Sequence, residues 1–166
     1  LVALLGLGDE SSRRKSRFSL AAAAKSLPSG NYEIINPEAV DNLEIEVLGW
    51  LLNNYVFDKY KNKKASQAYL VRPKKINNDR VLKFAEAEAL ARNLINTPTS
   101  DMGPEDLGSA VKNLAIKFDA DFSEIVGESL VKQNFPLIHA VGRASSQEPR
   151  LLEIKSGNTG PKVTLV

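Results

Sequence analysis

The chain of 166 residues contains no cysteine and only one histidine. Without cysteine it has no disulfides, no cysteine-ligated zinc and no thiol nucleophile, and the composition fits a reducing cytosol. No apolar run is long enough to cross a bilayer. The sequence also lacks a G-x-S-x-G elbow, an H-E-x-x-H pair and a phosphate-binding P-loop. From its residues alone, we assign the chain no catalytic site.

The composition that is present is typical of a soluble globular protein. Hydrophobic residues make up 43% of the chain and charged residues 25%, with a net charge of +2 that demands no polyanionic partner. The length suits one ordinary domain or two pieces of domains. Because strand-like patterns stand at both ends, at Val2–Leu7 and Val163–Val166, and the first residue is not Met, we interpret the chain as a fragment.

Hydrophobic periodicity predicts strands that alternate with helices, which favours an α/β fold with a mainly parallel sheet. The expected strands are Val2–Leu7, Tyr32–Ile35, Gln67–Val71, Asp121–Ile125, Leu137–Val141, Arg150–Ile154 and Lys162–Val166. The expected helices cover about residues 13–26, 37–55, 79–95 and 104–118.

The most informative segment is 86–104, because it joins two of these helices. Asn96, Thr97 and Pro98 are expected to end one helix, and Pro104 is expected to begin the next. Residues 73–78 form the best linker candidate, and Asn78 is expected to cap the helix that follows. The segment therefore reads as a hinge without chemistry of its own.

A glycine turn, Gly6-Leu7-Gly8, stands between the first expected strand and helix. Glycines at such a place let backbone amides approach a phosphate. The third glycine of a dinucleotide fingerprint is replaced by Ser11, and Asp9 and Glu10 would repel an anion. We therefore favour a structural turn, with a nucleotide site as the alternative.

The single histidine, His139, lies in an apolar run without a nearby carboxylate in sequence, which favours a core or edge-strand residue over a ligand or base. The pair Ser145-Ser146 lies in an expected loop and has no surrounding nucleophile motif. Glu86 and Glu88 cannot face each other on a helix at a spacing of two.

Charged clusters are the remaining candidates. Asp119, Asp121 and Glu124 crowd one connection and offer oxygen ligands for a hard cation, although a solvated turn is the favoured interpretation. Basic residues that converged in the fold would form a nucleic-acid patch, but a solvated surface is again favoured. They are Arg13, Arg14, Lys15, Arg17, Lys59, Lys61, Lys63, Lys64, Lys74 and Lys75.

Three groups of segments, in order, resemble the leucyl aminopeptidase family, the M17 metallopeptidases. The groups are Gly49–Leu52 with Tyr55–Lys61, Ala89–Pro98 with Gly103-Pro104, and Ala140–Ser145 with Pro149–Leu151. The sequence departs from the family at Ala144, where glycine is usual, and at Asn134-Phe135-Pro136, where a glycine-containing turn is usual. A position with positive φ would be strained by alanine, so we expect this loop to differ in shape.

The resemblance implies a metal-dependent enzyme of two domains, which releases N-terminal residues from peptides by a water activated by two metals. It divides this chain into the later part of a macro-like N-terminal domain at 1–76, a linker helix at 77–98 and the opening βαβ part of the catalytic domain at 99–166. The family's Lys, Asp and Glu ligands for two divalent ions, Mn²⁺ or Zn²⁺, begin in a Gly-Lys-Gly segment after a strand like Lys162–Val166. They would therefore lie beyond Val166.

Consequently we assign no catalytic, metal-binding or substrate-binding residue and expect no cofactor in this chain, which alone should be inactive. The resemblance further implies a cytoplasmic homohexamer that acts on peptides, with no membrane partner. Two alternatives from other classes remain open. One is a macro-like module that binds nucleotide or DNA, and the other is a segment that serves assembly.

Overall fold

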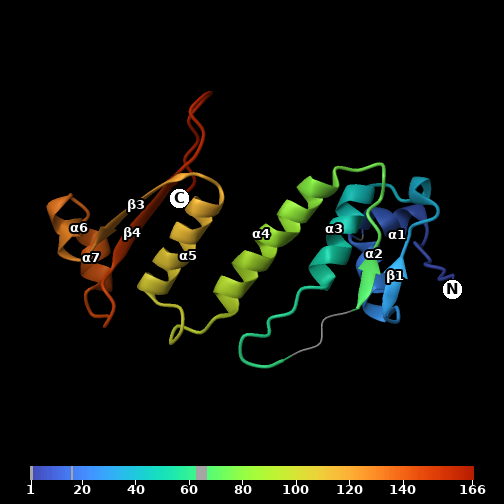
Figure 1. Ribbon diagram of the computed structural model, residues 1–166, viewed down its shortest axis with the longest axis horizontal. Helices are drawn as coiled ribbons and strands as arrows, with labels where there is room; N and C mark the ends of the chain where they lie inside the picture. The colour runs from blue at the N-terminus through green and yellow to red at the C-terminus, as the bar shows by residue number, and fades with distance from the viewer. Residues whose placement is uncertain (1, 16, 63–66) are drawn as a thin grey trace. The chain divides into compact units, whose positions relative to one another are not determined.

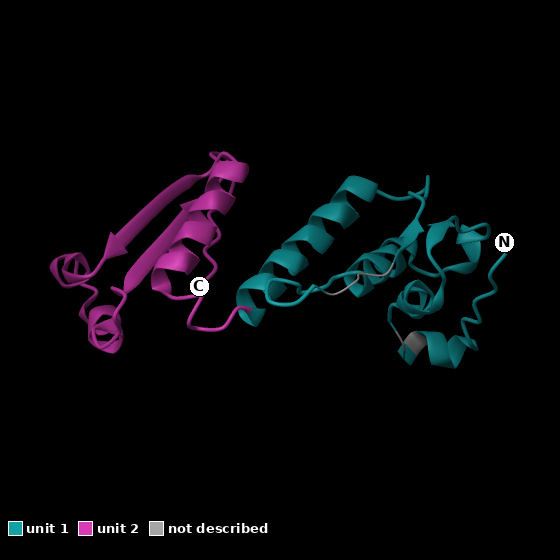
Figure 2. Cartoon of the chain, turned by 60° about the horizontal axis from the view of Figure 1, so that its bottom comes forward, with its two compact units in different colours: residues 1–96 teal, residues 97–166 magenta. Residues whose placement is uncertain are grey.

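The computed structural model describes residues 2–15, 17–62 and 67–166. Contacts between residues divide the chain into two compact units, Leu1–Asn96 and Thr97–Val166, which Figure 2 shows in teal and magenta. Both units combine helices with a pair of strands, so the expected α/β class is confirmed. Each unit has its own packing and is described by itself.

The first unit is mainly helical, and its two strands pair in parallel with Gly30 opposite Ala68. Its elements are α1 (Glu10–Lys15), α2 (Ser19–Ser26), β1 (Gly30–Tyr32), the 3₁₀ turn η1 (Pro37–Ala39), α3 (Leu43–Asn53), β2 (Ala68–Leu70) and α4 (Asn78–Asn96) (Figure 1). The core lies where α2, α3 and β2 meet.

Four buried residues form that core: Leu20, Ala24, Trp50 and Ala68. Ala24 and Ala68 are completely buried, and such small side chains let the backbones approach the large Trp50 ring closely. The indole Nε1 of Trp50 donates a hydrogen bond of 3.1 Å to the carbonyl of Ala68, which satisfies the polar atom of a ring that is 2% exposed.

The first turn of α3 connects the helices of this unit. Asn42 caps α3, since its Oδ1 accepts from the amide of Ile45 at 3.3 Å. Glu46 then accepts from the amide of Leu20 at 2.8 Å, at the start of α2. Glu44 accepts from the amide of Asn77 at 3.1 Å, immediately before α4. Two carboxylates in the first turn of α3 therefore accept hydrogen bonds from backbone amides at the starts of two other helices, where no partner within the helix is available.

Four expectations for this unit change. The strand expected over Tyr32–Ile35 is instead β1 at Gly30–Tyr32. The helix expected over 13–26 is two helices, because Phe18 adopts a left-handed φ of 63° between them. The helix expected from Pro37 begins instead at Leu43, after the 3₁₀ turn. Val2–Leu7 is not a strand: it pairs with no described strand, and Leu4 is 97% exposed.

The second unit places one long helix on an antiparallel strand pair. Its elements are α5 (Pro104–Lys117), β3 (Asp121–Val126), α6 (Glu128–Lys132), α7 (Pro136–Gly142) and β4 (Arg150–Lys155) (Figure 1). Glu124 lies opposite Leu152 in the β3–β4 register, and α5 contacts both strands. The expectation of a mainly parallel sheet is therefore wrong for this unit, although α5, β3 and β4 occur where the sequence predicts them.

Two of the strands predicted in this unit are also wrong. Leu137–Val141 belongs to α7, which begins at Pro136; proline suits the first turn of a helix, where no backbone hydrogen bond is lost. Lys162–Val166 is extended but unpaired within the described chain, and Leu165 is 92% exposed. A short apolar run does not by itself distinguish a strand from a helix.

Three consecutive side chains of the second unit pack against three glycines. Gln147 lies on Gly103, Glu148 on Gly127, and Pro149 on Gly142, so closely that a Cβ on any of these glycines would overlap its neighbour. Gly127 also has a φ of 55°, which favours glycine. Segment 147–149 therefore joins the beginning of α5, the end of β3 and the end of α7.

Candidate functional site

The hinge predicted over 86–104 has the expected form. Helix α4 ends at Asn96 and α5 begins at Pro104. Two backbone amides at the start of α5 find side-chain acceptors. Asp106 accepts from the amide of Gly103 at 3.0 Å, and Gln147 accepts from the amide of Glu105, also at 3.0 Å. These bonds stabilise a helix start, and no reactive side chain is placed there.

The glycine turn at Gly6 and Gly8 is structural. Gly8 has a φ of 73°, and Asp9 accepts from the amide of Ser12 at 2.7 Å. This backbone hydrogen bond from Ser12 is the main reason that the pKa of Asp9 lies below its ordinary 3.8. A carboxylate therefore occupies the helix start that a phosphate would need, as the favoured interpretation predicts.

His139 lies on α7, and its environment differs from the sequence-based expectation. Its Nε2 is 3.2 Å from Glu128 Oε1, so α6 supplies the neighbouring carboxylate that the local sequence lacks. The His139 side chain is 18% exposed and that of Glu128 77%. One imidazole and one carboxylate make a contact between two short helices, not a set of metal ligands. Ser145, from the pair predicted to lie in a loop, follows α7, and its hydroxyl accepts a hydrogen bond from the amide of Gln147 at 3.2 Å.

The three carboxylates near β3 do not converge. Glu124 pairs with Arg150 at 2.5 Å and lies toward α5, near Gly108. Asp121 is three residues away on the same strand, so its side chain is on the opposite face. Asp119 precedes the strand with a φ of 49°. The cation-site interpretation therefore has no geometric support.

Arg150 is a structural residue that the sequence pattern does not single out. Its Nη2 lies 3.7 Å from Glu105, so together with Glu124 it joins β3, β4 and α5. The side chain is 16% exposed, which reduces the screening of these charges by water. Only the fold brings the three charges together, because their sequence separations are 26 and 45 residues.

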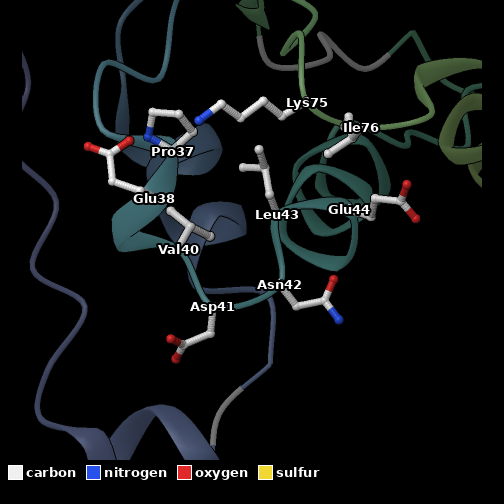
Figure 3. Close-up of a pocket in the computed structure, with 9 residues that line it drawn as sticks. All are labelled: Pro37, Glu38, Val40, Asp41, Asn42, Leu43, Glu44, Lys75 and Ile76. Carbon is white, nitrogen blue, oxygen red and sulfur yellow. The ribbon is translucent and has the colours of Figure 1, made fainter.

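An open hollow of about 380 Å³ lies beside the start of α3. Figure 3 shows Leu43 and Ile76 beside it, with Lys75 from the same segment as Ile76 and Glu38 from η1. A neighbouring hollow of about 290 Å³ is lined by Arg13, Arg17, Asp41 and Glu46 among others. Both hollows mix acids with bases, so neither presents a field of one sign to a polyanion.

Among the described residues of the predicted basic clusters, one arginine is paired with an acid and two lysines have other neighbours. Arg13 pairs with Asp41 at 3.3 Å, and Lys59 lies 5.5 Å from the centre of the Tyr60 ring. Lys75 lies in the hollow that Glu38 also lines. Lys63 and Lys64 lie outside the described residues. These contacts favour the interpretation of a solvated surface.

The loop that departs from the family pattern is not strained at Ala144. Among the described residues other than glycine, positive φ occurs at Phe18, Asp119 and Asn134, so Ala144 does not have the positive φ that would favour glycine. Asn134 has the left-handed φ of 67°, a conformation that asparagine tolerates better than most residues. The turn before α7 is thereby formed without glycine.

Across residues 2–15, 17–62 and 67–166, no three His, Cys, Asp or Glu side chains come together as metal ligands. These residues therefore do not fit a metal centre of their own. Within the same ranges, no helix combines the length and the apolar character that a membrane span requires.

Comparison with protein families gives two matches in sequence order. Residues 2–73 match the family described as "M17 aminopeptidase, N-terminal domain", and residues 89–166 match "Cytosol aminopeptidase family, catalytic domain". Residues 74–88 lie between the two matches, and α4 begins in this interval.

Curated relatives that match most of this chain are named probable cytosol aminopeptidases. A probable cytosol aminopeptidase of Aquifex aeolicus is 32% identical over 127 residues, which are 71% of this chain and 26% of the relative. Another from Aeropyrum pernix is 30% identical over 174 residues, with 100% of this chain and 35% of the relative covered. The chain thus spans roughly a third or less of the length of these two relatives.

Solved structures agree with these matches. The cytosol aminopeptidase of Coxiella burnetii superposes with a TM-score of 0.79 and 34% identity, over 86% of this chain and 31% of that structure. The bottromycin maturation enzyme BotP, solved in complex with Mn, has a TM-score of 0.71 over 90% of this chain and 34% of its own; at 23% identity it supports the fold alone. The chain therefore belongs to the M17 cytosol aminopeptidase family.

Proposed function

We propose that this chain is part of a metal-dependent aminopeptidase that releases N-terminal residues from peptides. The observation that carries the proposal is that the chain matches the family's N-terminal domain and then its catalytic domain, in that order. Two relatives named probable cytosol aminopeptidases match 71% and 100% of the chain, and this similarity supports the proposal. A DNA- or nucleotide-binding module has no comparable support, because Asp9 occupies the turn and the two hollows mix charges.

The proposal assigns the metal ligands to a later part of a longer protein. The described residues do not bring three ligands together, so no step of the reaction is assigned to this chain's side chains. The family relationship supports metal dependence in general, and one solved structure of the same fold contains Mn. We propose Mn²⁺ or Zn²⁺ as the ions of the longer protein.

We further infer the domain limits and setting of that protein. Our proposed limits are 1–76 for the part of the N-terminal domain, 77–98 for the linker helix and 99–166 for the opening of the catalytic domain. The gap between the two family matches, at 74–88, supports a linker in this region. Relatives named cytosol aminopeptidases support a cytoplasmic location, and a homohexamer remains a proposal from the family resemblance.

The test is a peptidase assay on the longer gene product. The purified protein, loaded with Mn²⁺ or Zn²⁺, should hydrolyse a leucyl amide, and a chelator should abolish the hydrolysis. The matched control is the 166-residue chain under the same conditions, which should show no turnover. A longer protein that stays inactive with every divalent ion would refute the proposal, and metal-dependent turnover by the short chain would refute the assignment of the ligands.

A further inference from the structure

The end of α4 contacts a loop that is 38 residues earlier in sequence. Tyr55 lies two residues after the end of α3, and its hydroxyl donates to Asn93 Oδ1 at 2.8 Å. The same oxygen accepts from Asn96 Nδ2 at 3.1 Å. One phenol therefore bonds two side chains on the last turn of α4. We call Tyr55, Arg92, Asn93 and Asn96 the Tyr55 cluster.

The face of the Tyr55 ring makes a second kind of contact. The Arg92 guanidinium lies 5.4 Å from the ring centre, within the range of a cation–π interaction. Arg92 is itself oriented by Glu88, one helical turn earlier, whose carboxylate is 2.9 Å from Nε. Both the ring and the hydroxyl of Tyr55 therefore contact the last two turns of α4.

These contacts occur where α4 has little other burial. Val81, in the first turn, is the buried residue of this helix, whereas Asn93, Ile95 and Asn96 near its end are exposed. Ile95 is 80% exposed. Helix ends with few buried apolar contacts open most easily. The Tyr55 cluster stabilises the end of α4 in place of a hydrophobic core.

The cluster also joins the two family domains. Tyr55 lies within residues 2–73, which match the N-terminal domain, and its partners lie within residues 89–166, which match the catalytic domain. All four residues nevertheless belong to the first unit. The first residues matched to the catalytic domain are thus packed on the N-terminal domain, and Thr97, where the second unit begins, follows Asn96 directly.

We propose that Tyr55 is a positioning residue: its hydroxyl fixes the last turn of α4, in the segment where the residues matched to the catalytic domain begin. The inference rests on the proposed aminopeptidase function for its effect on the reaction. Tyr55 touches no reacting group, so it acts through Asn93 and Asn96. A shift of a distant support changes catalysis when it moves reacting groups out of their productive geometry.

The first test uses the 166-residue chain and the substitution Tyr55→Phe, which keeps the ring and removes the hydroxyl. Amide hydrogen exchange at residues 93–97 should accelerate roughly three- to thirty-fold, because two hydrogen bonds are lost at a helix end. Tyr69→Phe is the matched control, since Tyr69 is an exposed tyrosine on β2 of the same unit. Unchanged exchange in Tyr55→Phe would overturn the proposal.

A double-mutant cycle identifies the partner. If the hydroxyl acts through Asn93, the effects of Tyr55→Phe and Asn93→Ala on exchange should be clearly less than additive. Additive effects would mean that the two side chains stabilise α4 independently, and the proposed link between them would be wrong.

The second test uses the longer protein loaded with metal. Tyr55→Phe should lower kcat per metal-loaded site at least about threefold, whereas Tyr69→Phe should leave it unchanged. A merely structural role would reduce the yield of folded protein but not kcat per loaded site, and that outcome would overturn the positioning role. If the unsubstituted longer protein is inactive, the aminopeptidase proposal fails, and the exchange measurement decides the role of Tyr55 on its own.

Discussion

The two units of this chain are stabilised in different ways. In the first unit, a core of one large ring and three smaller side chains lies between helices, and its strands are three residues long. In the second unit, the strands are six residues long and pair antiparallel under α5. The second unit combines this backbone pairing and the side chains packed against glycines with buried apolar residues such as Ala115 and Leu130.

This difference shows how strand pairing depends on the available partner. β3 and β4 pair over all six residues, from the pair of Asp121 with Lys155 to the pair of Val126 with Arg150. β1 and β2 pair over only three residues, and the extended segment at Val2–Leu7 pairs with no described strand. Because an isolated strand leaves its backbone groups to water, an apolar pattern alone does not make a strand.

The largest expected effect is in the core of the first unit. Trp50→Ala should destabilise the first unit by about 3–5 kcal/mol, since it empties the centre of the core. Urea unfolding followed by circular dichroism would measure the loss, because the chain has no other tryptophan to report fluorescence. Trp50→Phe should cost less, since it keeps apolar volume and loses mainly the hydrogen bond to Ala68.

The same variant tests whether the units are independent. Hydrogen exchange in β3 and β4 should be unchanged in Trp50→Ala, because the two strands are packed within the second unit. If β3 and β4 lose their protection from hydrogen exchange together with the first unit, the chain unfolds as one cooperative body. The two units would then not be stabilised independently.

A smaller effect is expected from Gly142→Ala in the second unit. The added Cβ would overlap Pro149, whose ring cannot rotate away, so we expect a destabilisation of about 1–3 kcal/mol. Gly108→Ala is the matched control, because its Cβ would have 3.3 Å to Glu124 and 3.6 Å to Arg150 and Leu152. Alanine also suits the interior of α5 better than glycine. Equal melting temperatures for the two variants would contradict the proposed packing of segment 147–149.

The smallest expected effects concern an exposed ion pair, Glu153 with Lys155. Hydrogen bonding to Lys155 is the main cause that lowers the pKa of Glu153 below its ordinary 4.5, and the same bond raises the pKa of Lys155 above 10.5. Stability from Glu153 is therefore present above pH 4.5 and is lost as the pH falls through its lowered pKa. Stability from Lys155 is present below pH 10.5 and is lost as the pH rises through its raised pKa.

A titration followed by nuclear magnetic resonance would check this pair. Lys155→Met should return the pKa of Glu153 toward 4.5, while the pKa of Asp9 in the first unit, which is lowered by the Ser12 amide, should stay below 3.8. The effect on unfolding should be slight, because water screens exposed pairs. A Glu153 pKa that does not respond to Lys155→Met would contradict the assigned cause.

Much of the fold was predictable where local signals agree with the tertiary environment. Pro104 begins α5 as expected, and β3 and β4 occur as expected because each meets the other as a paired strand. The helix expected from Asn78 does form, although the cap is Asn77, whose Oδ1 accepts from the amide of Arg80 at 3.0 Å. At α4 and α5, local chemistry therefore determined the helix start to within about one residue.

The candidate site was less predictable, because its informative contacts join distant residues. The local sequence around His139 contains no carboxylate, yet Glu128 lies beside it, since α6 and α7 pack together. The same holds for Arg150, whose acidic partners come from α5 and β3. Hydrophobic periodicity describes one helix or strand at a time, so it does not predict contacts between elements.

The sequence by itself determined the hinge, the α/β class and the family, because these depend on local residue order that survives in any environment. Tertiary structure alone decided three other features. It decided that Leu137–Val141 is helical, that β3 and β4 run antiparallel, and that the Tyr55 hydroxyl bonds the end of α4. The physical reason is common to all three: each depends on which partner a segment meets after the chain has folded.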